Sequence, residues 1–138
     1  MKVDSIVNGI VIDHITAGKA MTLYKLLELD KLDCSIALIQ NAPSDVMGKK
    51  DIIKIATSDL DLNLDVIGYV SPNVTVNIIR NKEIIEKKHL SLPARLVNII
   101  KCKNPRCITT TEQGIDHIFT LHGESRTEYR CYYCDAKP

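Results

Sequence analysis

Four of the five cysteines stand in two close pairs near the end of the printed sequence. Four residues separate Cys102 from Cys107, two separate Cys131 from Cys134, and twenty-three lie between the pairs. Two such pairs on separate loops can supply the four ligands of a tetrahedral zinc site, because zinc binds readily to thiolates. Four thiolates leave no coordination position open for water, so we predict one structural Zn²⁺ ion rather than a catalytic one.

Other interpretations of the cysteines and histidines are open. The same four thiolates could hold an iron–sulfur cluster. His117 and His122 lie between the pairs and could each replace a cysteine, although surface or loop positions are the simpler interpretation. Cys34 stands alone in an apolar stretch and is interpreted as an ordinary buried thiol.

The segment that carries the cysteine pairs is poor in large apolar residues and balanced in charge. Its apolar residues are too few for a core, which favours a metal that holds the module together. Residues 102–138 carry five basic and five acidic side chains. Phosphate binding needs a positive excess, so we expect no nucleic-acid partner and favour docking to a protein.

Positive charge is concentrated in two short patches elsewhere, at residues 49–54 and 80–101. Solvated faces are one interpretation, and a site for a compact anion is the other. Asp13 and His14 end the first expected strand, and the lysines of the two patches flank later strands. If those strands are neighbours, a carboxylate, a histidine and several lysines would form a nucleotide site. The sequence has no Gly-rich phosphate loop and no nucleophile–base motif, so we do not expect an enzyme.

The elements that must position these side chains follow from hydrophobic spacing. Expected strands cover residues 2–14, 34–40, 49–57, 74–81 and 82–89, with Asn81 near the turn of the last pair. One helix is expected after Thr16 as its N-cap, and another over 58–70 with Ser58 or Asp59 as its cap. Residues 41–48 are expected to form a turn, and residues 90–96 a linker.

This order predicts an α+β protein with two domains. Residues 1–92 would form a ferredoxin-like α/β sandwich, an antiparallel sheet with two helices on one face. Residues 97–138 would form a small all-β zinc-binding domain. No apolar stretch approaches the roughly 20 residues that span a bilayer, and no secretory signal is apparent, so we expect a cytoplasmic protein without a membrane partner.

Several stretches together resemble the regulatory chain of aspartate carbamoyltransferase. They are "GIVIDHITAGKA", "PSDVMGKKDIIKIAT", "PNVTVNIIRN", "SLPAR" and the spacing of the four cysteines. The resemblance implies a non-catalytic subunit that controls pyrimidine biosynthesis. Its first domain would bind CTP as inhibitor and ATP as activator, with UTP as a further candidate, and would pair two regulatory chains. Its zinc domain would dock on the catalytic chain.

The resemblance also implies roles for single residues in nucleotide binding. Asp13 and Lys54 would engage the ribose and base, and His14 and Lys87 would face the phosphates. Ile6, Ile79 and Lys82 would line the base pocket. Val3 and Ile84 would flank the sugar. Lys50 and Asn77 would help to hold a second nucleotide. A stand-alone zinc-ribbon module that binds nucleic acid or protein is the alternative function.

Overall fold

The computed structural model describes residues 7–57, 61–123 and 128–138. The chain divides into two compact units, Met1–Ser91 and Leu92–Pro138. The first unit contains β1 (Gly9–Thr16), α1 (Ala20–Leu26), the 3₁₀ helix η1 (Leu29–Lys31), β2 (Ile36–Ser44), β3 (Gly48–Ile55), α2 (Leu64–Val70), β4 (Thr75–Arg80) and β5 (Glu83–His89). The second contains β6 (Arg95–Val97), α3 (Ile108–Thr111), β7 (Ile118–His122) and β8 (Glu128–Cys131).

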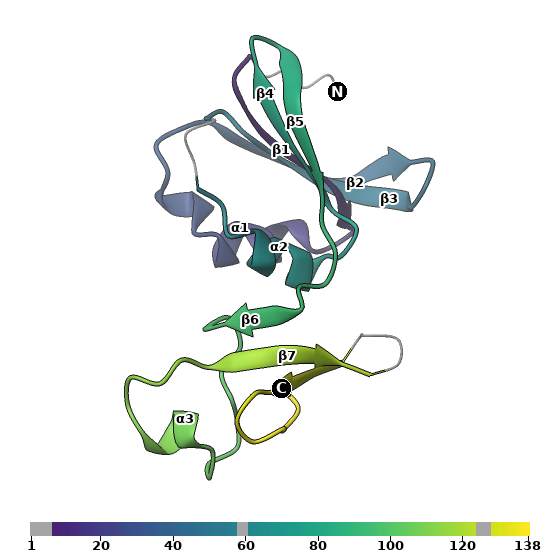
Figure 1. The fold of residues 1–138 in the computed structure, drawn as a ribbon. Helices are drawn as coiled ribbons and strands as arrows, with labels where there is room; N and C mark the ends of the chain where they lie inside the picture. Colours follow the sequence, from purple (N-terminus) through teal and green to yellow (C-terminus); the bar gives the residue numbers. More distant parts are fainter. Residues whose placement is uncertain (1–6, 58–60, 124–127) are drawn as a thin grey trace. The chain divides into compact units, whose positions relative to one another are not determined.

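The strands of the first unit form one sheet in the order β2-β3-β1-β4-β5. Every neighbouring pair is antiparallel. Helices α1 and α2 lie on the same face of this sheet (Figure 1). The predicted antiparallel sandwich, with its order of strand, helix, two strands, helix and two strands, is therefore confirmed.

The core of the first unit lies between the sheet and the helices. Alternate residues of β1 and β3, such as Ile10, Ile12, Ile53 and Ile55, are buried there because successive side chains of a strand point to opposite faces. The helices contribute Ala20, Leu23 and Ile67. The side chains between these sheet positions consequently face away from the helices.

The start of α1 differs from the prediction. Thr16 is the last residue of β1 and does not cap the helix, and the N-cap residue Lys19 makes no side-chain hydrogen bond there. The buried carboxylate of Asp51 accepts the Ala20 N–H instead, at 3.2 Å. A partner from a distant strand has thus replaced the local cap that the sequence favoured.

Helix α2 also begins later than predicted. Asn63 is its N-cap, and the Asn63 side chain accepts the N–H groups of Asp65 and Val66. Ser58 and Asp59, the predicted caps, lie outside the described residues. Asn63 satisfies the first donors of a helix as Ser or Asp would, so the sequence offered several equivalent starts.

Two strands are placed differently from the prediction. Within the described residues β1 covers Gly9–Thr16 rather than ending at residue 14. Strand β2 continues to Ser44, so the turn shortens to residues 45–47. Pro43 is compatible with this longer strand because β2 is at the edge of the sheet, where a missing N–H leaves no neighbour unpaired.

The second unit is built on a three-stranded antiparallel sheet in the order β6-β7-β8. Strand β6 begins at Arg95, within the stretch predicted to be a linker. The short helix α3 follows directly after Cys107. Leu96, Ile118, Phe119 and Tyr129 are buried in this unit together with three of the cysteines.

None of the helices in the described ranges has the length and hydrophobicity that crossing a bilayer would require.

Candidate functional site

The four paired cysteines converge at one point of the second unit. Their sulfur atoms all lie within 4.8 Å of one another, and none is in a disulfide. The Sγ atoms of Cys102 and Cys134 are 3.5 Å apart, and those of Cys107 and Cys131 are 3.7 Å apart. Four sulfur donors that crowd together without a covalent bond have the arrangement of a metal-binding site.

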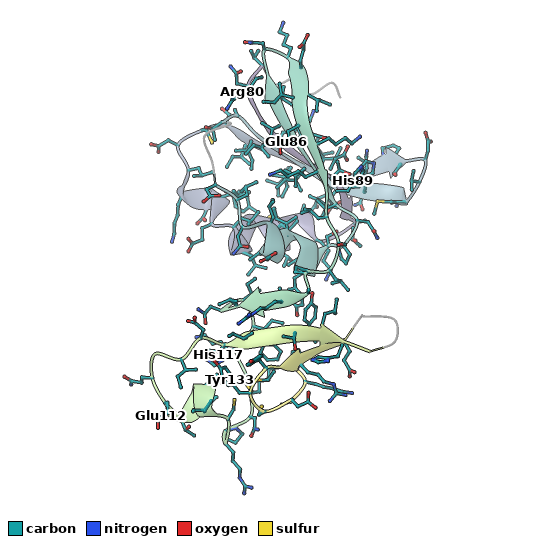
Figure 2. The ribbon with its side chains drawn as sticks, in the orientation of Figure 1. Arg80, Glu86, His89, Glu112, His117 and Tyr133 are labelled. Atoms are coloured by element: carbon teal, nitrogen blue, oxygen red, sulfur yellow. The ribbon has the colours of Figure 1, made fainter. Side chains whose placement is uncertain are left out.

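Hydrogen bonds from neighbouring residues hold the two cysteine loops. The Thr109 hydroxyl donates to the Cys107 sulfur at 3.1 Å, within the buried interior. The Cys102 N–H donates to Nδ1 of His117 at 3.0 Å. His117 directly precedes β7 and is labelled in Figure 2. The Cys131 N–H donates to the Ala136 carbonyl at 2.9 Å, which closes the second loop.

The surroundings shift the pKa values of three of these thiols. Burial raises the pKa of Cys102 to about 12. Burial also raises the pKa of Cys131. A hydrogen bond from the Asn104 side chain holds the pKa of Cys134 down at about 6. The two thiols with raised pKa values are protonated at neutral pH, and a bound cation would deprotonate them and balance their charge.

The second group of predicted side chains lies on the sheet face opposite the helices. Cross-strand pairing places Lys54 beside Val11, Val11 beside Asn77, and Asn77 beside Lys87. This row crosses β3, β1, β4 and β5, because paired residues of neighbouring strands share a face. Two lysines from distant parts of the sequence thus lie on one face with a nearly buried amide between them.

Asp13 lies on the same face, at an irregular point of β1. The register shifts between Ile12 and Ile15, so Asp13 and His14 together oppose a single residue of β3. His14 has a φ of 60°. The Asp13 carboxylate accepts the His14 N–H at 2.6 Å and is 3.0 Å from the Lys50 ammonium. This β-bulge therefore places a carboxylate, an imidazole and a lysine beside the polar row, toward the end of β1.

Two buried polar atoms of this face have no hydrogen-bond partner in the described structure: Nδ1 of His14, which is 4.0 Å from the Asp13 carboxylate, and Oδ1 of Asn77. Within the same described ranges, no ion pair involves Lys54 or Lys87. Buried polar atoms normally have hydrogen-bond partners, so these orphans point to a group that is supplied by a ligand. Because the ammonium groups of these two lysines are in no ion pair within the described residues, they would favour an anionic ligand.

Three of the remaining predicted nucleotide contacts lie near the β4–β5 turn. Ile79 pairs with Ile84 across the hairpin, and Gly9 of β1 pairs with Ile79. Lys82 is in the turn with a φ of 66°, and its N–H donates to the Val7 carbonyl at 2.9 Å. Val3 and Ile6, also predicted to contact the nucleotide, lie outside the described residues.

Sequence reasoning missed several residues around both sites. Val11 and Thr75 line the polar face, and no motif singled them out. Asp51 is fully buried beneath this face. The lysines around it in "KKDIIK" were candidates for an anion site, but Asp51 itself was not. Thr109 and His117 hold the cysteine loops. Their roles depend on cross-strand geometry, which spacing along the chain does not reveal.

Comparison with known protein families assigns a domain to each unit. Residues 1–91 match the family described as "Aspartate carbamoyltransferase regulatory chain, allosteric domain". Residues 94–137 match "Aspartate carbamoyltransferase regulatory chain, metal binding domain". The fold and the cysteine cluster are thus those of a regulatory protein with an allosteric and a metal-binding domain.

Curated relatives agree over nearly the whole chain. The chain is similar to the aspartate carbamoyltransferase regulatory chain of Clostridium tetani, with 45% identity over 98% of this chain and 94% of the relative. The regulatory chain of Bifidobacterium longum is 48% identical over 99% of this chain and 98% of its own length. That of Clostridium acetobutylicum is 49% identical over 98% and 92%, respectively. The chain belongs to the aspartate carbamoyltransferase regulatory chain family.

Proposed function

We propose that this chain binds nucleoside triphosphates on the outer face of the five-stranded sheet and thereby regulates aspartate carbamoyltransferase. CTP would inhibit and ATP would activate, which makes the chain a non-catalytic control element of pyrimidine biosynthesis in the cytoplasm. The carrying observation is the polar face itself. In the described structure Lys54 of β3 and Lys87 of β5, which are in no ion pair there, flank a buried amide whose oxygen has no hydrogen-bond partner.

The spacing of the polar row suits a ligand of this size. Neighbouring strands are about 4.8 Å apart, so the backbones of Lys54 and Lys87 are separated by about 14 Å. We assign Lys54 and Asp13 to the ribose and base, and Lys87 and His14 to the phosphates. Ile79, Lys82 and Ile6 would line the base pocket, while Ile84 and Val3 would flank the sugar. Lys50 and Asn77 would help to hold a second nucleotide, with UTP as a candidate.

We further propose that the metal is one structural zinc ion. Four sulfurs bound at 2.3 Å in a tetrahedron are about 3.8 Å apart, close to the spacing of this cluster. Thiolate-only ligation supports zinc over harder cations such as Mg²⁺. With every coordination position filled by cysteine, the ion would stabilise the fold, and the module would dock on the catalytic chain. A pair of regulatory chains would associate through the first unit.

The stand-alone zinc-ribbon function is disfavoured, because the match to the regulatory family includes the first unit as well as the second. Mixing the chain with a catalytic chain of aspartate carbamoyltransferase would distinguish the two. Co-elution and a new response of the activity to CTP and ATP are expected. A chain that leaves the CTP response unchanged and instead shifts DNA or RNA in a gel would contradict the proposal.

Two adjacent lysines of β5 provide a matched test of the nucleotide site. Lys87 pairs with Asn77 on the outer face, whereas Lys88 pairs with buried Val76 on the helix-covered face. Loss of a charge-assisted contact costs about 1.5–3 kcal/mol, so Lys87→Ala should weaken CTP binding about tenfold or more. Lys88→Ala should leave the affinity within about twofold.

Titration calorimetry on the full chain measures both variants, with zinc content as a check that the second unit is intact. Equal CTP affinities for the two variants would contradict the phosphate role of Lys87. An unmodified chain that binds neither CTP nor ATP, alone or with its catalytic partner, would contradict the proposed function altogether.

A further inference from the structure

Asp51 is a buried carboxylate that neither proposed site uses. Its side chain is fully inaccessible, at 0% exposure. Oδ2 accepts the N–H groups of Gly18 and Ala20 at 2.9 and 3.2 Å, and Oδ1 accepts the Asn41 N–H at 3.0 Å. One carboxylate therefore holds backbone donors from two segments on opposite sides of β3.

Both neighbours of β3 are bulged beside Asp51. In β1, Asp13 and His14 together oppose one residue of β3. In β2, the register shifts between Ile39 and Ala42, so two residues again oppose one, and Asn41 has a φ of 58°. Asn41, which donates to Asp51, belongs to the second bulge. Gly18 and Ala20 follow the first bulge by a few residues.

Sequence position connects this buried group to the polar face. Lys50 and Asp51 are adjacent in β3, so their side chains point to opposite faces. On the outer face, the Lys50 ammonium forms an ion pair with Asp13. On the buried face, the Asp51 carboxylate accepts a hydrogen bond from the turn after β1. Without an acceptor, the N–H group of buried Ala20 would lack a partner in the interior, and the backbone of residues 18–20 would have to move to reach water. Such a movement would carry Asp13 and His14 with it.

We propose that Asp51 is the positioning residue of the nucleotide site: its buried carboxylate fixes the bulge that presents Asp13 and His14, and it ties that bulge to the matching one in edge strand β2. This inference rests on the proposed nucleotide function. Asp51 does not touch the ligand. It acts through the backbone of residues 15–20. A ligand that displaces Asp13 would therefore also exert a force on β2 through Asp51.

The variant Asp51→Asn tests this with little change in shape. An amide turns one of the two acceptor atoms into a donor that faces backbone N–H groups. We expect CTP affinity of the full chain to fall about tenfold or more. Amide hydrogen exchange at Gly18, Ala20 and Asn41 should accelerate, while the zinc content is unchanged.

Ile55→Ala is the matched control for a general loss of stability. Ile55 is a fully buried residue of the same strand, and it pairs with Ile10 and Ile36, away from both bulges. Ile55→Ala should lower the melting temperature at least as much as Asp51→Asn does. It should leave CTP affinity within about twofold of the unmodified chain and the amides of Gly18, Ala20 and Asn41 protected from exchange. A CTP affinity for Asp51→Asn that equals the control's would overturn the positioning role.

A second variant covers the case in which Asp51→Asn does not fold. Gly18 has a φ of +93°, and a Cβ added there would meet no atom within 4 Å. Gly18→Ala therefore strains one donor of the network without crowding it, and we expect a loss of CTP affinity of about threefold. Unchanged affinity together with unchanged exchange would overturn the inference. An unmodified chain that binds no CTP would instead overturn the proposed function, while the exchange rates would still report on Asp51.

Discussion

The first unit buries a large cluster of aliphatic side chains between a five-stranded sheet and two helices. The second unit has a sheet of three short strands, and its buried residues include three of the four clustered cysteines. Small modules of this kind rarely gain enough stability from apolar burial alone. The contrast indicates that the two units, although joined in one chain, depend on different forces: packing in the first and metal ligation in the second.

The largest expected effect comes from removing one metal ligand. A structural zinc site contributes on the order of 10 kcal/mol to folding, so Cys107→Ser should unfold the second unit and leave the first intact. Metal analysis should show loss of the ion, and amide spectra should lose dispersion only for residues after about 92. Cys34→Ser is the control, because Cys34 is a half-buried thiol of the first unit. A Cys107→Ser chain that still holds one zinc would show that ligation is not what stabilises the module.

The next effect is a pH dependence of metal binding by the second unit. Burial raises the pKa of Cys102 to about 12 and also raises that of Cys131, so both are thiols at neutral pH before metal binds. Cys134, with a pKa lowered to about 6 by its bond from Asn104, is already ionised there. Zinc binding at pH 7 should therefore release at least about two protons, and affinity should fall about a hundredfold per unit decrease in pH. Calorimetry in buffers of different ionisation enthalpy counts these protons; a release near zero would contradict ligation by buried thiols.

A core substitution should affect the first unit without regard to metal. Leu23 of α1 is fully buried in the aliphatic cluster, whereas Leu26 on the same helix is 53% exposed. Leu23→Ala should cost about 2–5 kcal/mol, because it leaves a cavity in a packed core. The melting temperature of the first unit should fall equally with and without a chelator, and Leu26→Ala should have little effect. If the melting temperature of Leu23→Ala fell only after chelation, the stability of the first unit would depend on the second.

The smallest effect concerns a helix cap. The Asn63 side chain accepts the N–H groups of Asp65 and Val66 at 3.1 and 3.4 Å. Asn63→Ala should destabilise the first unit by about 1 kcal/mol. Denaturant titration should show this shift in the first unit while zinc retention is unchanged. Destabilisation of the metal centre by the same substitution would count against separate units.

The sequence predicted the parts of the molecule that depend on local pattern. Alternating apolar residues in "GIVIDHI" and paired cysteines identified the sheet and the metal cluster, because both signals lie within short segments. The expected strands also predicted that Asp13, His14 and the lysines of the two patches could meet if their strands were neighbours. Two lysine patches separated by twenty-five residues thus had a structural reason to be considered together.

What the sequence did not predict depends on contacts between distant segments. Thr16 was a reasonable helix cap by local rules, but the carboxylate of Asp51 took that role from another strand. The bulges of β1 and β2 carry no signature in "IDHIT" or "IQNAP", since they arise from pairing with β3. His117 looked like a surface residue, and its bond to the Cys102 N–H appears only when β7 is placed.

The most direct test is CTP titration of the full chain before and after zinc is removed with a chelator. If the first unit folds through its own core and carries the nucleotide site, the chelated chain should bind CTP with an affinity within about twofold of the zinc-loaded chain, although its second unit is unfolded. Loss of CTP binding together with the metal would contradict the account, because it would show that the nucleotide site depends on the metal-bound unit.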